Sequence, residues 1–237
     1  MIRVFNMIKL FNMRRIKITP GEYYHIYNRG NNKQPIFLDE RDWLRFLFLI
    51  IYFQSPLTFY NIGRQITHFV KHSVFNIPDE VVKEIINRRG VELINFTQMS
   101  NHFHLTIHEL KKMGTSQYMQ RVLNSYTKYF NTKYKKSGHL FQGPFQCVHI
   151  KDDNQLIYLS AYIHRNPREI KEWINKEHAF PWSSYQDCIN KNRWGELLKP
   201  GIITEQFSSG EKYKYFVETN GAKEFSKLLD EKLLFDN

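Results

Sequence analysis

The feature that most constrains the fold is the alternation of apolar and polar side chains over residues 102–109, HFHLTIHE. Successive side chains of a strand point to opposite faces, so His102 and His104 share one face and the apolar side chains share the other. A strand with one apolar face belongs to a sheet that is covered on that side. The apolar residues of this strand are Phe103, Leu105 and Ile107.

Strand and helix patterns follow one another along the rest of the chain without a regular rhythm. Strands are predicted over 22–29, 91–97 and 145–150, where β-branched and aromatic residues gather. Helices are predicted from Asp39 to about Phe53, over 64–75, from Asp79 to Gly90, from Thr115 to about Lys135 and from Asp152 to about Asn166. This order indicates an α+β fold, in which an antiparallel sheet has helices packed on one face and a C-terminal helical tail follows. A weak amphipathic helix is predicted within that tail, over 222–234.

Composition excludes several classes of protein. The longest apolar run, 46–53, has eight residues, whereas a membrane span needs about 20. The two cysteines, Cys147 and Cys188, lie too far apart in the sequence for a disulfide scaffold or a cysteine zinc site within the chain. We therefore expect a cytoplasmic protein. Its net charge of +11 favours a polyanionic partner, either nucleic acid or an anionic membrane surface. No long basic amphipathic helix supports the membrane alternative.

The positive charge is concentrated in the middle of the chain. Residues 111–150 contain seven Lys or Arg and no Asp or Glu. Arg121, Lys128 and Lys135 recur every seven residues, which places them on one stripe of the predicted helix. Such a stripe can follow a phosphate backbone. The alternative is an ordinary solvated helix face.

His102-Phe103-His104 is the first candidate site. Its two imidazoles lie about 6.6 Å apart along one face of a strand and could share a divalent metal ion. The alternative is a pair of exposed histidines with no ligand, because the pattern is short and common.

The segment YIHRNP, residues 162–167, is the second candidate site. Tyr162 and Asn166 are four residues apart and therefore neighbours on one helical face. A tyrosine can attack a phosphate, although its ordinary pKa near 10 makes it a weak nucleophile without a metal ion. The alternative is a half-buried helix tyrosine followed by an asparagine that ends the helix.

The turn after the first predicted strand is a third candidate. Residues 28–32, NRGNN, are rich in amide and backbone donors that suit phosphate or base-edge contacts. A plain β-turn is the competing interpretation.

Together these blocks resemble a known family. The sequence is similar to REP-associated tyrosine transposases, within the single-tyrosine HUH transposases of bacterial insertion sequences. The similarity extends over about residues 21–185. It is carried by YHIYNRGN (24–31), MSNHFHL (99–105), SYTKYFNTKYKKSGHLFQGPF (125–145), YIHRNP (162–167) and PWSSY (181–185).

The resemblance implies a ferredoxin-like fold and a reaction on DNA. Single-stranded DNA would be cleaved and rejoined at hairpin-bearing sites, with Tyr162 forming a 5′-phosphotyrosine. His102, His104 and Asn166 would hold Mg²⁺ or Mn²⁺, and a set of two nitrogens and one oxygen is more typical of Mn²⁺. Together with the basic stripe and the turn, the expected DNA contacts are Arg29, Asn31, Arg121, Lys128, Lys135 and Lys136.

The expected organisation has three parts. Residues 1–20 form an N-terminal extension, 21–170 the catalytic domain with a helical insertion at 55–90, and 171–237 the tail. The protein would be bacterial and nucleoid-associated, and either a monomer or a homodimer. Two other functions remain open: a hairpin-binding protein that does not cleave, and a metal-dependent phosphodiesterase that uses water.

Overall fold

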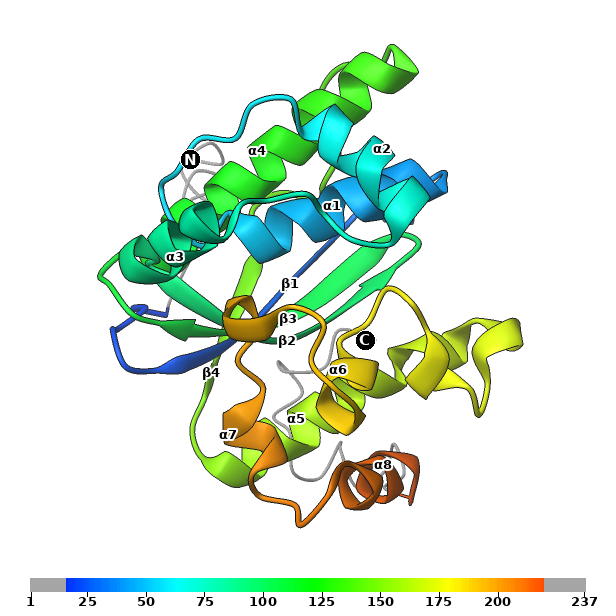
Figure 1. Cartoon of the computed structure of the whole chain (residues 1–237). Helices are drawn as coiled ribbons and strands as arrows, with labels where there is room; N and C mark the ends of the chain where they lie inside the picture. The colour runs from blue at the N-terminus through cyan, green and yellow to red at the C-terminus, as the bar shows by residue number, and fades with distance from the viewer. Residues whose placement is uncertain (1–15, 220–237) are drawn as a thin grey trace, which may run out of the picture.

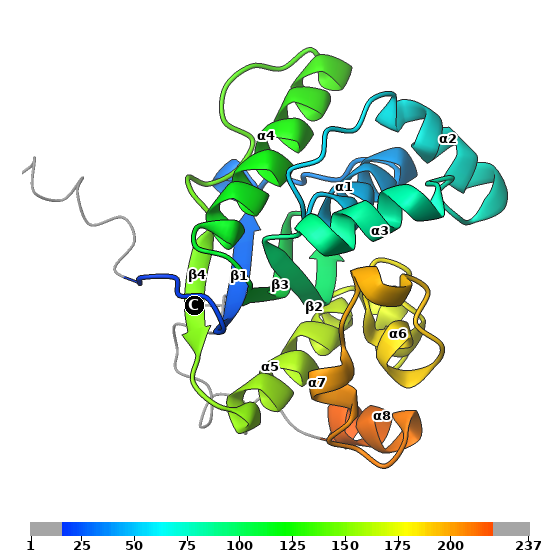
Figure 2. The same cartoon turned by 60° about the vertical axis from the view of Figure 1, so that its left-hand side comes forward.

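One four-stranded antiparallel sheet organises the molecule. The computed structural model describes residues 16–219 and gives the strand order β2-β3-β1-β4. Figure 2 shows the strands side by side in this order, with β4 and β2 as the two borders of the sheet. The strands are β1 (Tyr23–Arg29), β2 (Val91–Met99), β3 (His102–Glu109) and β4 (Gln146–Ile150). The predicted strands are therefore present.

Two helices cover one face of the sheet (Figure 1). They are α1 (Glu40–Tyr52), between β1 and β2, and α4 (Gly114–Tyr134), between β3 and β4. The resulting order βαββαβ, with two helices on one face, is ferredoxin-like. The predicted α+β class is confirmed.

Capping and burial explain why α1 forms where it does. The Asp39 side chain accepts a hydrogen bond from the backbone N–H of Asp42 and caps the helix. The carboxylate of Asp42 is fully buried and accepts hydrogen bonds from the phenols of Tyr129 and Tyr134 and from the ammonium of Lys133, all on α4. The start of α1 is thereby fixed to the end of α4.

An apolar layer fills the space between these helices and the sheet. Phe46 of α1 contacts Phe103 of β3, with ring centroids 4.9 Å apart, and Tyr126 of α4 at 5.1 Å. We call this side of the sheet the packing face. Its main side chains are Tyr24, Ile26, Leu93, Phe96, Phe103, Leu105 and Ile107.

The opposite face of the sheet is covered as well. Helix α5 (Asp153–Arg165) crosses beneath it in Figure 1, and short helices of the tail pack on α5. The sequence predicted helices on one face only. The difference arises because α5 has apolar residues of its own, among them Leu156, Leu159 and Ile163, which form a second core with the tail and with Ile94 of β2. The tail helices are α6 (Tyr185–Ile189), α7 (Gly201–Thr204) and α8 (Gly210–Thr219).

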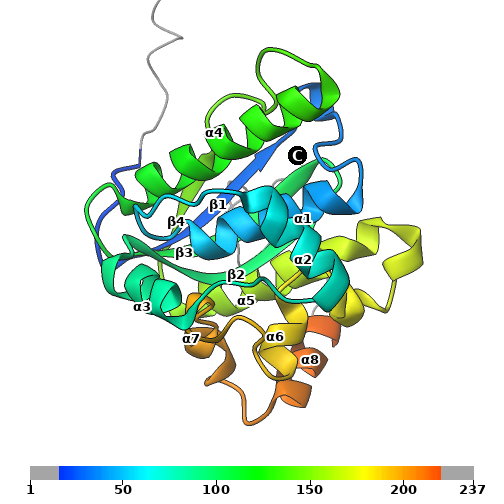
Figure 3. The same ribbon diagram turned by 45° about the horizontal axis from the view of Figure 1, so that its top comes forward.

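Two further helices occupy the range where an insertion was expected. They are α2 (Ile62–His72) and α3 (Asp79–Arg88), and Figure 3 shows both on the side of α1 away from α4. Within residues 16–219, no helix is long and apolar enough to cross a membrane. The helix predicted at 222–234 and most of the N-terminal extension lie outside the described residues.

A β-bulge interrupts the pairing of β2 with β3. Leu93 pairs with Ile107 and Asn95 pairs with Thr106, so that Ile94 is an additional residue. Ile94 belongs to the second core, beside α5. The bulge shifts the alternation of β2 by one residue, so Leu93 and Phe96 both lie on the packing face, although an uninterrupted strand would place them on opposite faces.

Candidate functional site

Strand pairing gathers several histidines and a tyrosine on the face of the sheet that α5 covers. In the β1–β3 register, Tyr27 lies opposite His104 and Arg29 lies opposite His102. Side chains directly opposite one another share a face. His25, one alternation before Tyr27, lies on this face too. We call it the histidine face.

His104 is the buried centre of this group. Its side chain has no solvent exposure, and its Nδ1 lies 2.9 Å from Nε2 of His25. Burial holds the pKa of His104 well below its ordinary value, and the nearby rings of His102 and His25 lower it further. The imidazole is therefore neutral near pH 7, the state in which histidine binds metal ions.

Helix α5 presents Tyr162 and Asn166 to the two strand histidines. The ring of Tyr162 lies 5.5 Å from that of His104, at an interplanar angle of 83°. Asn166, where α5 ends, has its Oδ1 3.2 Å from Nε2 of His102. The structure thus brings together all four residues expected at the site.

Two asparagine side chains fix how His102 can hydrogen-bond. Asn101 donates through Nδ2 to the carbonyl of Lys33, at 3.1 Å, so its oxygen accepts from Nδ1 of His102, at 2.7 Å. Asn166 donates through Nδ2 to the carbonyl of Tyr162, at 3.0 Å, so its oxygen faces the other ring nitrogen. A neutral imidazole carries a hydrogen on only one of its two nitrogens. In neutral His102, the lone pair of the other nitrogen therefore faces the lone pair of an asparagine oxygen. This donor set fits a cation held between the imidazole and the amide oxygen.

The candidate ligands include an amide, which is an uncommon choice. Among residues 16–219, no group of three or more His, Cys, Asp or Glu could hold a metal ion. Two imidazoles and one amide oxygen are therefore the set that this part of the chain offers.

The tail holds α5 against the sheet. His164, buried on α5, has its Nε2 3.0 Å from the hydroxyl of Ser184, which also accepts from the backbone N–H of Phe96 on β2, at 2.8 Å. Its Nδ1 lies 2.7 Å from the phenol of Tyr213 on α8. Burial lowers the pKa of His164 to about 3. This neutral chain of hydrogen bonds fixes the helix that carries Tyr162.

The expected DNA contacts divide into two groups. Lys128, Lys135 and Lys136 are exposed, and so is Asn31. Arg29 donates through Nε to the side-chain oxygen of Gln142, at 2.7 Å, at the edge of the histidine face.

Arg121 corrects the expectation of a continuous basic stripe. Its guanidinium donates to the backbone carbonyls of Phe53, Ser55 and Leu57. The side chain caps the end of α1, where carbonyl groups lack helical partners. Its charge is used inside the fold, and we do not count it as a DNA contact.

Two residues of the site were missed by the sequence analysis. His25 contacts His104, and Tyr27 lies beside this pair, with its ring centroid 4.8 Å from that of His25 and 6.0 Å from that of His104. Burial raises the pKa of Tyr27, to which Cys147 also contributes. The alternation of residues 22–29 contained the signal, because it places both residues on one face. The strand order that puts β1 beside β3 could not be inferred from it.

A match to a family model agrees with the resemblance found in the sequence. Residues 64–166 match the family model described as "Transposase IS200 like". No curated protein matches the chain. A solved REP-associated tyrosine transposase bound to a REP hairpin has 15% sequence identity and a TM-score of 0.48, with 84% of this chain and 96% of that chain covered.

Two guanylyltransferase structures are also similar. A bacterial tRNA(His) guanylyltransferase-like protein in complex with GTP has 11% identity and a TM-score of 0.38, with 75% and 79% of the two chains covered. The tRNA(His) guanylyltransferase of Saccharomyces cerevisiae has 11% identity and a TM-score of 0.35, with 97% and 85% covered. Similarities at this level carry no conclusion about function.

Proposed function

We propose that this chain is an IS200-like transposase, because residues 64–166 match that family model, and that it cleaves and rejoins single-stranded DNA through a tyrosine intermediate. The observation that carries the proposal is the meeting of Tyr162 and Asn166 on α5 with His102 and His104 on β3. The two pairs are far apart in sequence. Each pair was a candidate site from its own local pattern, and the resemblance predicted that the two pairs form one site.

The proposed nucleophile is the phenolic oxygen of Tyr162. It forms a bond to the phosphorus of the scissile phosphate while the bond from phosphorus to the 3′-oxygen breaks. The phenolic proton leaves the tyrosine and one proton is taken up by the 3′-oxygen, so the step is balanced. The products are a 5′-phosphotyrosine and a free 3′-hydroxyl. Attack by another 3′-hydroxyl reverses the step and rejoins the strand without an external energy source.

His102, His104 and Asn166 are the proposed ligands of a divalent metal ion, Mg²⁺ or Mn²⁺. A bound cation would polarise the scissile phosphate and neutralise charge that develops on it. The chain itself orients the ligands: Asn101 holds Nδ1 of His102, and His25 holds Nδ1 of His104. Both histidines therefore present Nε2 to the site.

The proposed substrate is hairpin-bearing DNA, as in the related structure bound to a REP hairpin. Exposed lysines support a DNA partner, since Lys128, Lys135 and Lys136 lie on or just beyond α4. We propose Arg29 and Asn31 as further contacts, because both lie where β1 ends near the site.

We also propose that residues 21–170 form the catalytic domain. All six elements of the βαββαβ unit and α5 fall within it, and α2 and α3 form an insertion within 55–90. Residues 171–219, the described part of the tail, would act as a support, for which the contact of Ser184 with His164 is the argument.

A denaturing gel tests the proposal. The full chain is incubated with 5′- or 3′-labelled hairpin DNA from the flanks of its own gene, with Mn²⁺, Mg²⁺ or EDTA. We expect a covalent protein–DNA band with the 3′-label only, because the tyrosine retains the 5′-phosphate. Tyr27→Phe is the matched control, since Tyr27 also lies close to the ring of His104.

The variants separate the remaining alternatives. Tyr162→Phe should abolish the covalent band, whereas Tyr27→Phe should retain it. Cleavage that persists in Tyr162→Phe would replace the tyrosine mechanism by one that uses water. Tight binding of the flanking hairpin with no cleavage in any lane would indicate a binding protein.

A further inference from the structure

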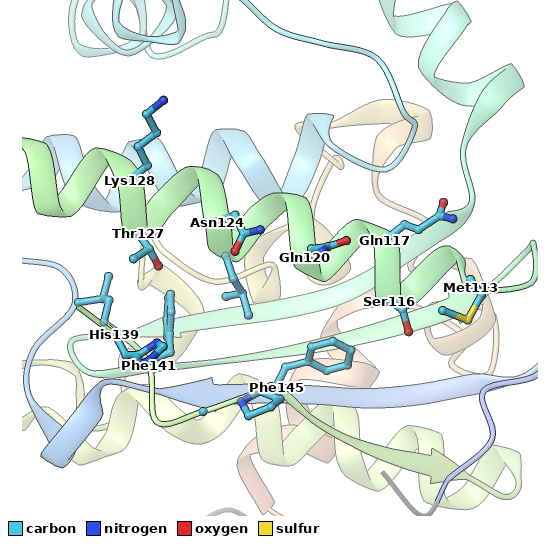
Figure 4. Close-up of a pocket in the computed structure, with 14 residues that line it drawn as sticks. Met113, Ser116, Gln117, Gln120, Asn124, Thr127, Lys128, His139, Phe141 and Phe145 are labelled. Atoms are coloured by element: carbon cyan, nitrogen blue, oxygen red, sulfur yellow. The ribbon is translucent and has the colours of Figure 1, made fainter. Parts of the chain in front are cut away.

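A groove lies on the opposite side of the molecule from the histidine face, between α4 and the segment 139–145. Its volume is about 800 Å³, and Figure 4 shows the side chains that line it. Phe141 and Phe145 form its apolar floor, and both are buried beneath α4. The groove uses residues of α4 that the proposed reaction does not require.

Three amide side chains of α4 line the groove. Gln117, Gln120 and Asn124 are spaced three and four residues apart, so they share one face of the helix (Figure 4). Within residues 16–219, no hydrogen bond occupies any of these three side chains. Each amide offers two donor hydrogens and an acceptor oxygen, the combination that reads the edges of bases.

The charge around the groove favours a polyanion. None of its lining residues is an Asp or Glu, and the exposed Lys128 stands at its border. Lys128 also borders a smaller hollow on the other side of α4, beside Arg45. Lys135 and Lys136 follow at the end of the helix. The phosphates of a DNA strand that follows α4 would lie close to these lysines, while the bases of the strand would reach the amide side chains of the groove.

The groove is connected to the histidine face by its own wall. Gln142, next to Phe141, accepts a hydrogen bond from Arg29, at 2.7 Å, and the carbonyl of Gly143 accepts one from Asn28, at 3.1 Å. Arg29 in turn lies opposite His102 in the sheet. A strand that leaves the groove over residues 142–144 therefore arrives at the proposed site of cleavage.

We propose that this groove binds unpaired nucleotides of the DNA substrate, with their bases against the amides of α4 and their phosphates near Lys128. The inference rests on the proposed function in that the same DNA strand is the substrate. Single bases suit a concave groove lined by amides and aromatic rings, because such surfaces hold unstacked bases by hydrogen bonds and apolar contact.

Binding to matched oligonucleotides tests the groove without requiring cleavage. Anisotropy of the full chain in EDTA is measured with labelled twelve-nucleotide dA, dT and dC oligomers and with an abasic oligomer of equal phosphate number. The native chain should prefer the best base-bearing oligomer to the abasic one. The double variant Gln120→Ala, Asn124→Ala should lose about tenfold or more of its affinity for that oligomer and none for the abasic one.

Two controls make the pattern specific. Lys128→Ala should weaken both oligomers alike and lower the slope of log affinity against log salt by about one. Gln206→Ala, an exposed amide in the tail, should change neither affinity.

The outcome is independent of the cleavage assay. Equal binding of base-bearing and abasic oligomers by the native chain, or an unchanged double variant, would overturn the groove assignment even if the covalent band forms. The native chain could also show a base preference that the double variant loses, while no substrate gives a covalent band. This result would support the groove assignment and contradict the proposed reaction.

Discussion

The two faces of the sheet are made by the same strands but differ in chemistry. On the packing face, Phe103 and its neighbours meet α1 and α4 in an apolar layer. The histidine face, which α5 covers, carries His25, Tyr27 and His104, and Thr106 lies on it as well. Both faces are buried, yet only one is apolar. The comparison teaches that burial alone does not reveal which face of a sheet performs chemistry; the polarity of the buried residues does.

The largest effect on stability is expected from the packing face. Phe103→Ala should lower the free energy of unfolding by about 3–5 kcal/mol, because it removes a fully buried ring and leaves a cavity. Urea denaturation followed by circular dichroism measures this change. A loss below about 1 kcal/mol would show that the apolar layer does not depend on this residue. It would contradict the claim that the packing face contributes most to stability.

Alkaline titration tests the packing layer in another way. Burial raises the pKa of Tyr52 on α1 to about 12, from an ordinary value of 10.0. As the pH rises, the phenol of Tyr52 therefore loses its proton in the unfolded chain first. Its contribution to the free energy of unfolding is complete below pH 10 and is lost as the pH rises from about 10 to 12. The expected loss is about 1.4 kcal/mol per pH unit for this group. Denaturation at several pH values should show a shallower dependence in Tyr52→Phe than in the native chain.

On the histidine face, His25 should affect the site more than stability. His25→Ala removes the partner of Nδ1 of His104 and should weaken Mn²⁺ binding by about 10–100-fold. Isothermal titration calorimetry measures the affinity, and Tyr24→Phe, the neighbouring residue on the packing face, serves as control. An unchanged affinity would mean that His25 does not position His104.

The smallest effect is expected at Thr106. Its hydroxyl is buried and, within the described residues, has no hydrogen-bond partner. Thr106→Val keeps the shape and removes this polar atom, so the free energy of unfolding should stay the same or rise by up to about 1 kcal/mol. A clear fall in the free energy of unfolding of this variant, measured by thermal denaturation, would reveal that the hydroxyl has a stabilising partner.

The parts of this fold that the sequence predicted are those set by local pattern. The alternation over 102–109 identified β3 and both of its faces, and Asp39 marked the start of α1. The prediction of a basic stripe was wrong at Arg121, because spacing along a helix does not show whether a side chain contacts the end of a neighbouring helix. The prediction that helices cover one face only was wrong for a similar reason, since the position of α5 depends on a second core that it forms with the distant tail.

The candidate site was predictable only in part. Local patterns identified His102 with His104 on one strand face and Tyr162 with Asn166 on one helix face. The resemblance was needed to combine the two pairs, because no local rule joins residue 104 to residue 162. His25 was overlooked, although its strand was predicted, since its contact with His104 requires β1 and β3 to be neighbours. Such contacts are properties of topology and register, which a single strand pattern does not contain.

The bulge in β2 has a consequence for how this chain can change in length. Removal of Ile94 would restore regular alternation between Leu93 and Asn95, so both faces of the sheet would keep their residues. Removal of a residue such as Thr97 would instead turn over one half of the strand and send Phe96 or Gln98 to the wrong side. Insertions and deletions within β2 should therefore be inherited only at the bulge, where one codon can be gained or lost without exchanging the two faces.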